Sequence, residues 1–250
     1  MPIKRLRIFA GPNGSGKSFL KKNIPSTIPI GYYINADDIE SRILSAKGIK
    51  LNKYGIQTTN AEFQEFIRNS SYARHKSNIP TLLKFLHLEN NTIKITENGS
   101  AKYAAAIITD FIREINLKAG NDFSFETVMS HPEKIKFIKK ANKLGYHVYL
   151  YYICTDSPEI NIFRVQQRVA QGGHNVPEIK IKKRYFRSLN LLYPALKQCY
   201  KSYLIDSTEI NSVKIIAQIN RDKIITISGK PEEIPSWVIK YVFNKIWSRQ

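Results

Sequence analysis

Short apolar runs alternate with helix-forming stretches along most of the chain. Five runs are predicted to be strands, at 5–10 (RLRIFA), 31–36 (GYYINA), 122–128 (DFSFETV), 147–153 (HVYLYYI) and 202–207 (SYLIDS). Alternation of this kind predicts an α/β fold, with a mostly parallel sheet flanked by helices. Ligands of such sheets bind beyond the carboxyl ends of the strands. Candidate functional residues are therefore sought after each strand.

The sequence predicts where two of the intervening helices begin. From Ile135 to Leu144 an apolar side chain recurs every third position, which predicts a helix with one buried face that Gly145 ends. We expect Ser130, Pro132 and Glu133 to open this helix with a capping box. Ser157 and Pro158 are expected to cap and start the helix after the fourth strand.

Residues 48–98 fit the alternation less well. They contain a predicted helix at about 60–72, a second at about 80–88 and a polar turn at 89–91 (ENN). We interpret them as an insertion, or substrate-side cap, in a single domain that spans residues 1–250. Residues 211–250 are a C-terminal extension with a helix or strand, a strand and an amphipathic helix, whose Trp237 and Trp247 are expected in the core.

The composition limits the classes of protein to which this chain can belong. With 250 residues, 42% of them hydrophobic, the chain can bury one large core. It has no apolar run of the roughly 18 residues that a membrane span needs, and no signal-peptide core, so a cytoplasmic protein is expected. Cys154 and Cys199 are too few for a disulfide framework and are predicted to be free thiols.

The formal net charge is +19, from 39 Lys and Arg against 20 Asp and Glu. The basic residues are spread from Lys4 to Arg249 and form no tail. Background charge, attraction of anionic nucleotides and binding of nucleic acid all remain open as explanations.

The segment after the first strand carries the most specific motif. Residues 11–18 (GPNGSGKS) fit G-x-x-x-x-G-K-[ST], the phosphate-binding loop of nucleotide-binding enzymes. A strand precedes the loop and a predicted helix follows it, as the motif requires. Its glycines would let backbone N–H groups turn toward phosphate oxygens of ATP. Lys17 would reach the β- and γ-phosphates and Ser18 would bind Mg²⁺. The predicted nucleotide-binding residues are Gly11, Pro12, Asn13, Gly14, Ser15, Gly16, Lys17 and Ser18.

Carboxylates follow two further strands. Asp37, just after the second strand, is the candidate base that accepts a proton from an acceptor hydroxyl, although it or Asp38 could instead cap the next helix. Glu126, with Thr127 beside it, ends the third strand. It could bind the acceptor or a metal-bound water, or be a structural carboxylate.

Arginines suggest a lid. Arg164 and Arg168 are four residues apart, so they share one helix face. Gly172, Gly173 and His174 follow, and the next predicted helix carries Arg184. Closing such a lid could bring arginines onto the transferred phosphate, although each could also be merely solvated.

Several of these blocks together resemble the zeta-toxin-like P-loop kinase family, in particular its short stand-alone bacterial members. They are GPNGSGKS, INADDIE, FSFETVMSHPEK, YLIDS and the segment from Gly145 to Leu189, and they span about residues 3–210. The resemblance implies ATP and Mg²⁺ as cofactors, with Lys17 on phosphate, Ser18 on the metal and Asp37 as the base. It also implies that Glu126 lies on the acceptor side and that Arg164, Arg168 and Arg184 stabilise transferred charge. Thr127 and His174 are further candidate acceptor-binding residues.

In zeta toxins proper the acceptor is the sugar 3′-hydroxyl of UDP-N-acetylglucosamine, and an antitoxin is the partner. This chain departs from them because Pro12 directly follows the first glycine and His174 stands near an expected arginine. The prediction is an ATP-dependent kinase of a small-molecule hydroxyl, with a nucleotide sugar as the leading acceptor. The alternatives are a polynucleotide 5′-hydroxyl kinase and a nucleic-acid-associated P-loop ATPase.

Overall fold

The structure is a computed structural model that describes residues 3–46, 48–70, 79–96, 100–210, 212–221 and 223–248. The chain forms two compact units. The first joins Met1–Pro29 to Phe125–Gln250, and the second is Ile30–Ser124. The predicted insertion at 48–98 falls in the second unit, and its residues 71–78 and 97–98 lie outside the described ranges. The single domain over 1–250 stays a prediction.

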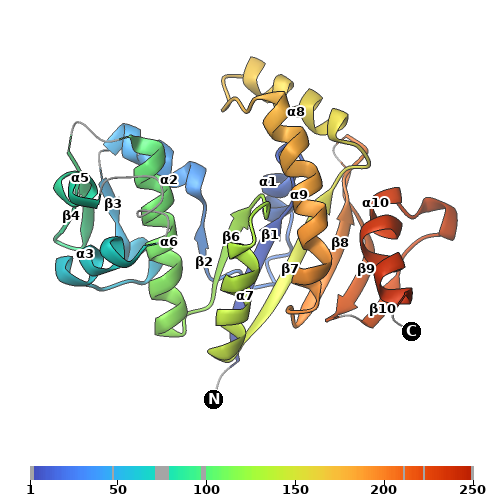
Figure 1. Cartoon of the computed structure of the whole chain (residues 1–250), viewed down its shortest axis with the longest axis horizontal. Helices are drawn as coiled ribbons and strands as arrows, with labels where there is room; N and C mark the ends of the chain where they lie inside the picture. Colours follow the sequence, from blue (N-terminus) through green and yellow to red (C-terminus); the bar gives the residue numbers. More distant parts are fainter. Residues whose placement is uncertain are drawn as a thin grey trace. The chain divides into compact units, whose positions relative to one another are not determined.

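Six strands build the sheet of the first unit, in the order β10-β9-β8-β7-β1-β6 (Figure 1). Their bounds are Lys4–Ala10 (β1), Phe123–Thr127 (β6), Tyr146–Cys154 (β7), Lys201–Asp206 (β8), Lys214–Asn220 (β9) and Lys223–Ile227 (β10). Strands β1 and β8 run parallel to β7, while β9 is antiparallel to both β8 and β10. The predicted α/β class and the predicted strands of this unit are confirmed.

The helices of this unit are α1 (Lys17–Lys22), α7 (Glu133–Lys143), α8 (Pro158–Ala170) and α9 (Glu178–Leu196). Alternate residues of the central strands, such as Leu6, Ile8 and Val148, are fully or almost fully buried. At the α9 side, the hydroxyl of Tyr152 donates to Ser188 Oγ at 3.0 Å. This bond joins β7 to α9 within the buried core of the first unit.

Two predictions about helix ends and the core are wrong. No capping box opens α7: Pro132 is the N-cap without a side-chain bond, and the Glu133 N–H donates to His131 Nδ1 at 3.3 Å. The C-terminal segment has α10 (Ser236–Val238), a π-helical turn (Ile239–Phe243) and α11 (Asn244–Trp247). Trp237 is buried as expected, but Trp247 is 52% exposed.

The second unit contains β2 (Tyr32–Ile34), α2 (Ala36–Ala46), a 3-10 turn (Leu51–Tyr54), α3 (Asn60–Asn69), α5 (Ile79–Phe85) and α6 (Ala101–Ala119). A three-stranded sheet adds β3 (Gly48–Lys50), β4 (Leu86–Glu89) and β5 (Thr92–Ile95) in the order β3-β5-β4. The helix predicted at about 60–72 is confirmed as α3 to Asn69, and its end at 71–72 lies outside the described residues. The helix predicted at about 80–88 is confirmed as α5 only to Phe85, because residues 86–88 belong to β4. The small sheet was not predicted.

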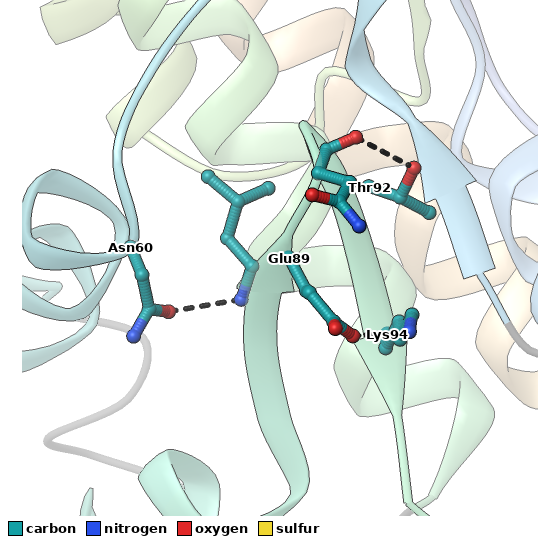
Figure 2. A network of polar contacts seen from close by, with 6 residues as sticks. Asn60, Glu89, Thr92 and Lys94 are labelled. Atoms are coloured by element: carbon teal, nitrogen blue, oxygen red, sulfur yellow. Dashed lines mark hydrogen bonds and ion pairs between the residues drawn. The ribbon is translucent and has the colours of Figure 1, made fainter.

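The predicted turn at 89–91 joins β4 to β5. Asn90 and Asn91 have φ of 48° and 53°, which is the left-handed backbone of a tight hairpin turn. Figure 2 shows the contacts around it: Glu89 pairs with Lys94, the Thr92 hydroxyl donates to the Asn90 carbonyl at 3.3 Å, and Asn60 Oδ1 accepts the Leu88 N–H at 2.9 Å. The last bond ties α3 to the hairpin.

None of the described helices combines the length and the apolar character that a membrane span needs. Both cysteines are free and buried, as predicted.

Candidate functional site

The loop at 11–18 connects β1 to α1 at the carboxyl edge of the sheet. Gly14 and Gly16 have φ of 78° and 84°, which side chains other than glycine rarely adopt. A Cβ on Gly14 would lie only 2.5 Å from the Asn161 carbonyl oxygen, so this glycine is also required by a close approach of α8. Alternation of left- and right-handed residues turns successive N–H groups toward one side, which favours an anion there.

Lys17 crosses the loop that precedes it. Its ammonium donates to the carbonyl oxygens of Gly11 at 2.9 Å and Pro12 at 2.7 Å. These two bonds to the backbone fix the side chain of half-buried Lys17 over the loop. A cation held at this place is what the phosphates of a nucleotide require.

Ser18 and Glu126 meet beside the loop. The Ser18 hydroxyl donates to Glu126 Oε2 at 3.3 Å, although the two residues are 108 positions apart. The Gly11 N–H donates to the Thr127 carbonyl at 3.2 Å, which joins the loop to the end of β6. The Thr127 hydroxyl accepts the Met129 N–H at 3.1 Å, so this side chain shapes the turn after β6.

Oxygen ligands of Ser18 and Glu126 suit Mg²⁺, which prefers hydroxyl, carboxylate and water oxygens. In the described ranges no three His, Cys, Asp or Glu side chains gather in a cluster that could hold a metal ion. A metal here would therefore depend on Ser18, Glu126, nucleotide phosphates and water.

Asn161 of α8 holds the loop from one side. Its amide donates to the Asn13 carbonyl at 2.5 Å, and its Oδ1 accepts the hydroxyl of Thr155. Asn161 and Thr155 have no exposed surface. The Tyr185 hydroxyl, whose pKa burial raises well above its usual value, donates to the Thr155 carbonyl at 2.7 Å. A buried network from β7, α8 and α9 thus ends on the phosphate loop.

Two further side chains reach the loop from α9 and from the end of β8. Arg184 Nη1 donates to Asn13 Oδ1 at 3.2 Å, and the Ser207 hydroxyl donates to the Ser15 carbonyl at 2.9 Å. Of the three predicted arginines, Arg184 is the one whose described hydrogen bonds reach the loop.

Arg164 and Arg168 have different partners. Arg164 Nη2 donates to the carbonyls of Thr208 and Glu209, at 3.1 and 3.0 Å, beyond the end of β8. Partial burial lowers the pKa of Arg164 and the nearby Asp206 charge opposes this. Arg168 Nη2 donates to the His174 carbonyl at 2.8 Å, so it holds the α8–α9 connection.

The α8–α9 connection has its own small core. Ile162, Val165, Val176 and Ile181 form a buried cluster under it. Lys182 also pairs with Glu159 at 3.2 Å. The segment predicted as a lid is therefore packed as one helical hairpin, with His174 contributing its backbone to Arg168.

Asp37 lies in the second unit, in the first turn of α2. Its N–H donates to Asn35 Oδ1 at 2.8 Å, and Asn35 also accepts the Ile39 N–H through its carbonyl. The helix is thus capped by Asn35 and not by Asp37 or Asp38. The Asp37 carboxylate is exposed and is not used as the cap.

Cys154 ends β7 close in sequence to Thr155, but it is no candidate nucleophile. Burial raises its pKa far above the usual value, and burial likewise raises the pKa of Cys199 to about 12. Both thiols therefore stay protonated at neutral pH.

Comparisons with known proteins support the resemblance seen in the sequence. The family model described as Zeta toxin matches residues 89–210. That segment includes Glu126, the α8–α9 hairpin and β8, while the phosphate loop precedes it. The chain is zeta-toxin-like.

Solved structures share the fold of this zeta-toxin-like chain. The PezAT chromosomal toxin–antitoxin system of Streptococcus pneumoniae is similar with a TM-score of 0.51 and 10% identity, over 100% of this chain and 88% of that one. The AvrRxo1-ORF1:-ORF2 complex with ATP has a TM-score of 0.50 and 13% identity, over 90% of this chain and 60% of that one. At these identities the similarity shows a shared fold alone.

A closer but shorter match is an uncharacterised protein of Haemophilus influenzae. It is 38% identical over 63 residues, which are 25% of this chain and 45% of that protein. The chain thus spans less than half the length of this relative and less than two thirds of the matched chain in the AvrRxo1-ORF1:-ORF2 complex.

The sequence analysis missed Thr155, Asn161, Tyr185 and Ser207. Two of them follow strands directly, since Thr155 comes after β7 and Ser207 after β8. That position is a usable signal, because polar residues at the carboxyl ends of parallel strands face the ligand edge. Asn161 and Tyr185 lie inside helices and carry no such signal.

Proposed function

We propose that this zeta-toxin-like chain is an ATP-dependent phosphotransferase that transfers the γ-phosphate of ATP to a hydroxyl group of a small molecule. The observation that carries the proposal is the grouping of Lys17, Ser18 and Glu126 at one loop, with Ser18 Oγ 3.3 Å from Glu126 Oε2. This set offers a cation for phosphates and oxygens for Mg²⁺. The ATP named in the AvrRxo1-ORF1:-ORF2 complex supports the choice of donor.

Each proposed role follows from position. Lys17 would hold the β- and γ-phosphates while the backbone of residues 11–16 surrounds them. Ser18 would bind Mg²⁺, with Glu126 beside it accepting hydrogen bonds from metal-bound water or from the acceptor. When bound, Mg²⁺ would supply charge neutralisation to the phosphates. Arg184, already bonded to Asn13, would stabilise negative charge on the nucleotide.

Asp37 would accept the proton of the acceptor hydroxyl. Its carboxylate is exposed and is not used as the helix cap, which suits a general base better than a structural role. Arg164 and Arg168 are proposed to order the α8–α9 hairpin through backbone carbonyls, and to reach the transferred phosphate only if those bonds exchange.

The acceptor we propose is a nucleotide sugar of the UDP-N-acetylglucosamine kind, with Glu126, Thr127 and His174 on its side of the site. A protein partner, an antitoxin, is supported by PezAT, which is described as a toxin–antitoxin system. Because ATP is the proposed donor, we expect the chain to act in the cytoplasm.

The test is transfer of label from γ-labelled ATP by the purified chain with Mg²⁺. One set of reactions contains a panel of nucleotide sugars, and another contains a 5′-hydroxyl oligonucleotide. We expect a labelled nucleotide sugar, and a loss of at least about 10³-fold in Lys17→Ala. Lys22→Ala is the matched control, because this lysine is exposed at the end of α1 and should leave the rate unchanged.

Label in the oligonucleotide and in no sugar would replace the proposed acceptor by a polynucleotide end. Release of phosphate without any labelled acceptor would instead indicate an ATPase. A rate that survives Lys17→Ala would contradict the proposed site itself.

A further inference from the structure

A cavity of about 530 Å³ lies at the edge of the first unit's sheet opposite to the phosphate loop. It opens where α7 meets β7, where α9 meets β8 and at the turn from β9 to β10. The residues that line it are Asn142, Gly145, Tyr146, His147, Lys197, Gln198, Tyr200 and Arg221. None of these is among the residues of the candidate kinase site, and its volume is in the range of small-ligand pockets.

Stacked rings form one wall of the cavity. The rings of His147 and Tyr200 lie 4.0 Å apart at an interplanar angle of 11°, and Tyr149 meets Tyr200 edge-on at 5.6 Å. The Tyr200 N–H donates to the Val148 carbonyl at 2.9 Å, which fixes the backbone that carries the ring. Tyr200 remains 43% exposed. The Tyr200 ring is therefore held by His147 on one face and by Tyr149 at an edge contact, while part of the residue stays exposed.

The charges around the cavity are of one sign. Lys197 and Arg221 line it, and none of the lining residues among those described is acidic. Arg5 is the register partner of His147 on β1. The next arginine on that face, Arg7, is 5% exposed, lies over the Tyr149 ring at 5.1 Å and has two nitrogens, Nε and Nη1, without a hydrogen-bond partner. This arrangement attracts an anion.

Polar groups also line the cavity. Asn142 of α7 donates from its amide to the Gln198 carbonyl at 2.6 Å, which joins the end of α7 to the turn between α9 and β8. Gln198 is itself a lining residue, and its amide is a neutral donor and acceptor. Rings, amides and cations together are the groups that recognise a base and its phosphate.

We propose that this cavity is a second site, which binds a nucleotide unit through its base on Tyr200 and its phosphate on Lys197 and Arg221. The shared chemistry is a planar base with a phosphate. It can come from a free mononucleotide or from single-stranded nucleic acid. The site is independent of the proposed kinase function, since it lies at the other end of the strands.

The experiment is fluorescence anisotropy of the whole chain with a labelled single-stranded oligonucleotide of ten thymidines, and in a second arm displacement of this probe by AMP. We expect Tyr200→Ala to weaken binding about tenfold, because one stacked base is lost, and Tyr200→Phe to retain it. We expect Arg221→Ala to lower the slope of log K against log salt by about 0.7. Lys17→Ala should bind the probe as the unchanged chain does.

Two control variants separate the cavity from the overall charge and from exposed rings in general. Phe186→Ala removes a ring that is 47% exposed on α9, and Arg187→Ala removes an exposed charge on the same helix. Neither should alter binding. Displacement of the oligonucleotide by AMP supports a free nucleotide as the ligand. Binding of the oligonucleotide without displacement by AMP supports single-stranded nucleic acid. The proposal is overturned if neither probe binds, or if Phe186→Ala and Arg187→Ala weaken binding as much as Tyr200→Ala and Arg221→Ala.

Discussion

The phosphate loop and the segment that carries Asp37 are held by contacts of different range. Residues 11–18 receive or donate bonds to Glu126, Thr127, Asn161, Arg184 and Ser207, which come from distant parts of the chain. The start of α2 is held by Asn35, two residues before Asp37. The difference suggests that the donor half of the proposed site is rigid because the core of the first unit fixes it, whereas the proposed base depends on a local cap.

The largest effect is expected from Asp37→Asn. The amide cannot accept the proton of an acceptor hydroxyl, so kcat should fall about 10²- to 10⁴-fold. ATP affinity and the free energy of unfolding should stay within about 0.5 kcal/mol of the unchanged chain, because the side chain is exposed and does not cap α2. Steady-state kinetics and urea unfolding measure both.

Asp38→Asn is the matched control, since it removes the same charge one residue further on. An equal fall in kcat for the two variants would mean that Asp37 acts through the general charge of the first turn and not as the base.

Gly14→Ala tests whether long-range contacts fix the phosphate loop. The new methyl group would lie 2.5 Å from the Asn161 carbonyl and the residue would keep a φ of 78°. We expect a loss of at least about 2 kcal/mol in unfolding free energy and a more than tenfold weaker ATP affinity, measured by urea unfolding and ATP titration.

Gly145→Ala separates backbone strain from the clash. Gly145 has a φ of 81°, and a Cβ there meets nothing within 4 Å. It should lose about 1 kcal/mol with ATP affinity unchanged. Equal losses for the two variants would show that the approach of α8 does not constrain the loop.

Asn161→Ala removes the long-range bond itself. The Asn13 carbonyl loses its donor and the buried Thr155 hydroxyl loses one acceptor, so we expect a loss of about 1–3 kcal/mol in unfolding free energy and weaker ATP binding. Gln166→Ala, which breaks an exposed bond from the same helix to Glu178, should stay within about 0.5 kcal/mol. If both variants bind ATP normally, the loop is ordered without α8.

The same difference in range explains what the sequence could predict. The phosphate loop was recognisable because its glycines and Lys17 determine its geometry within eight residues. The bond from Asn161 to Asn13 spans 148 positions, and no local pattern indicates it. The turn at Asn90 and Asn91 was predicted from residue type, yet β3, β4 and β5 were missed because strands of three or four residues show almost no alternation.

At Trp247 and at the start of α7 the sequence patterns predicted features that the structure does not have. Helical periodicity favoured a buried Trp247, but a π-helical turn at Ile239–Phe243 shifts the faces that follow it, and the ring is 52% exposed. The capping box at 130–133 had suitable residue types, but Pro132 holds the N-cap position and no cap bond forms. Local sequence patterns therefore predict where helices and strands form better than they predict which helix face is buried or which side chain caps a helix.

The smallest effect is expected from Asn35→Ala, which removes the local cap of α2. The Asp37 N–H loses its acceptor, and a cap of this kind contributes about 1 kcal/mol. Hydrogen exchange should become faster at the start of α2 and stay unchanged at the phosphate loop, since the contacts of that loop described above do not include Asn35. Ser45→Ala, which removes an exposed hydroxyl bond to the Arg42 carbonyl in the same helix, should change exchange much less. Faster exchange at residues 11–18 in Asn35→Ala would mean that the two halves of the proposed site are coupled, and that the local cap helps to order the donor half as well.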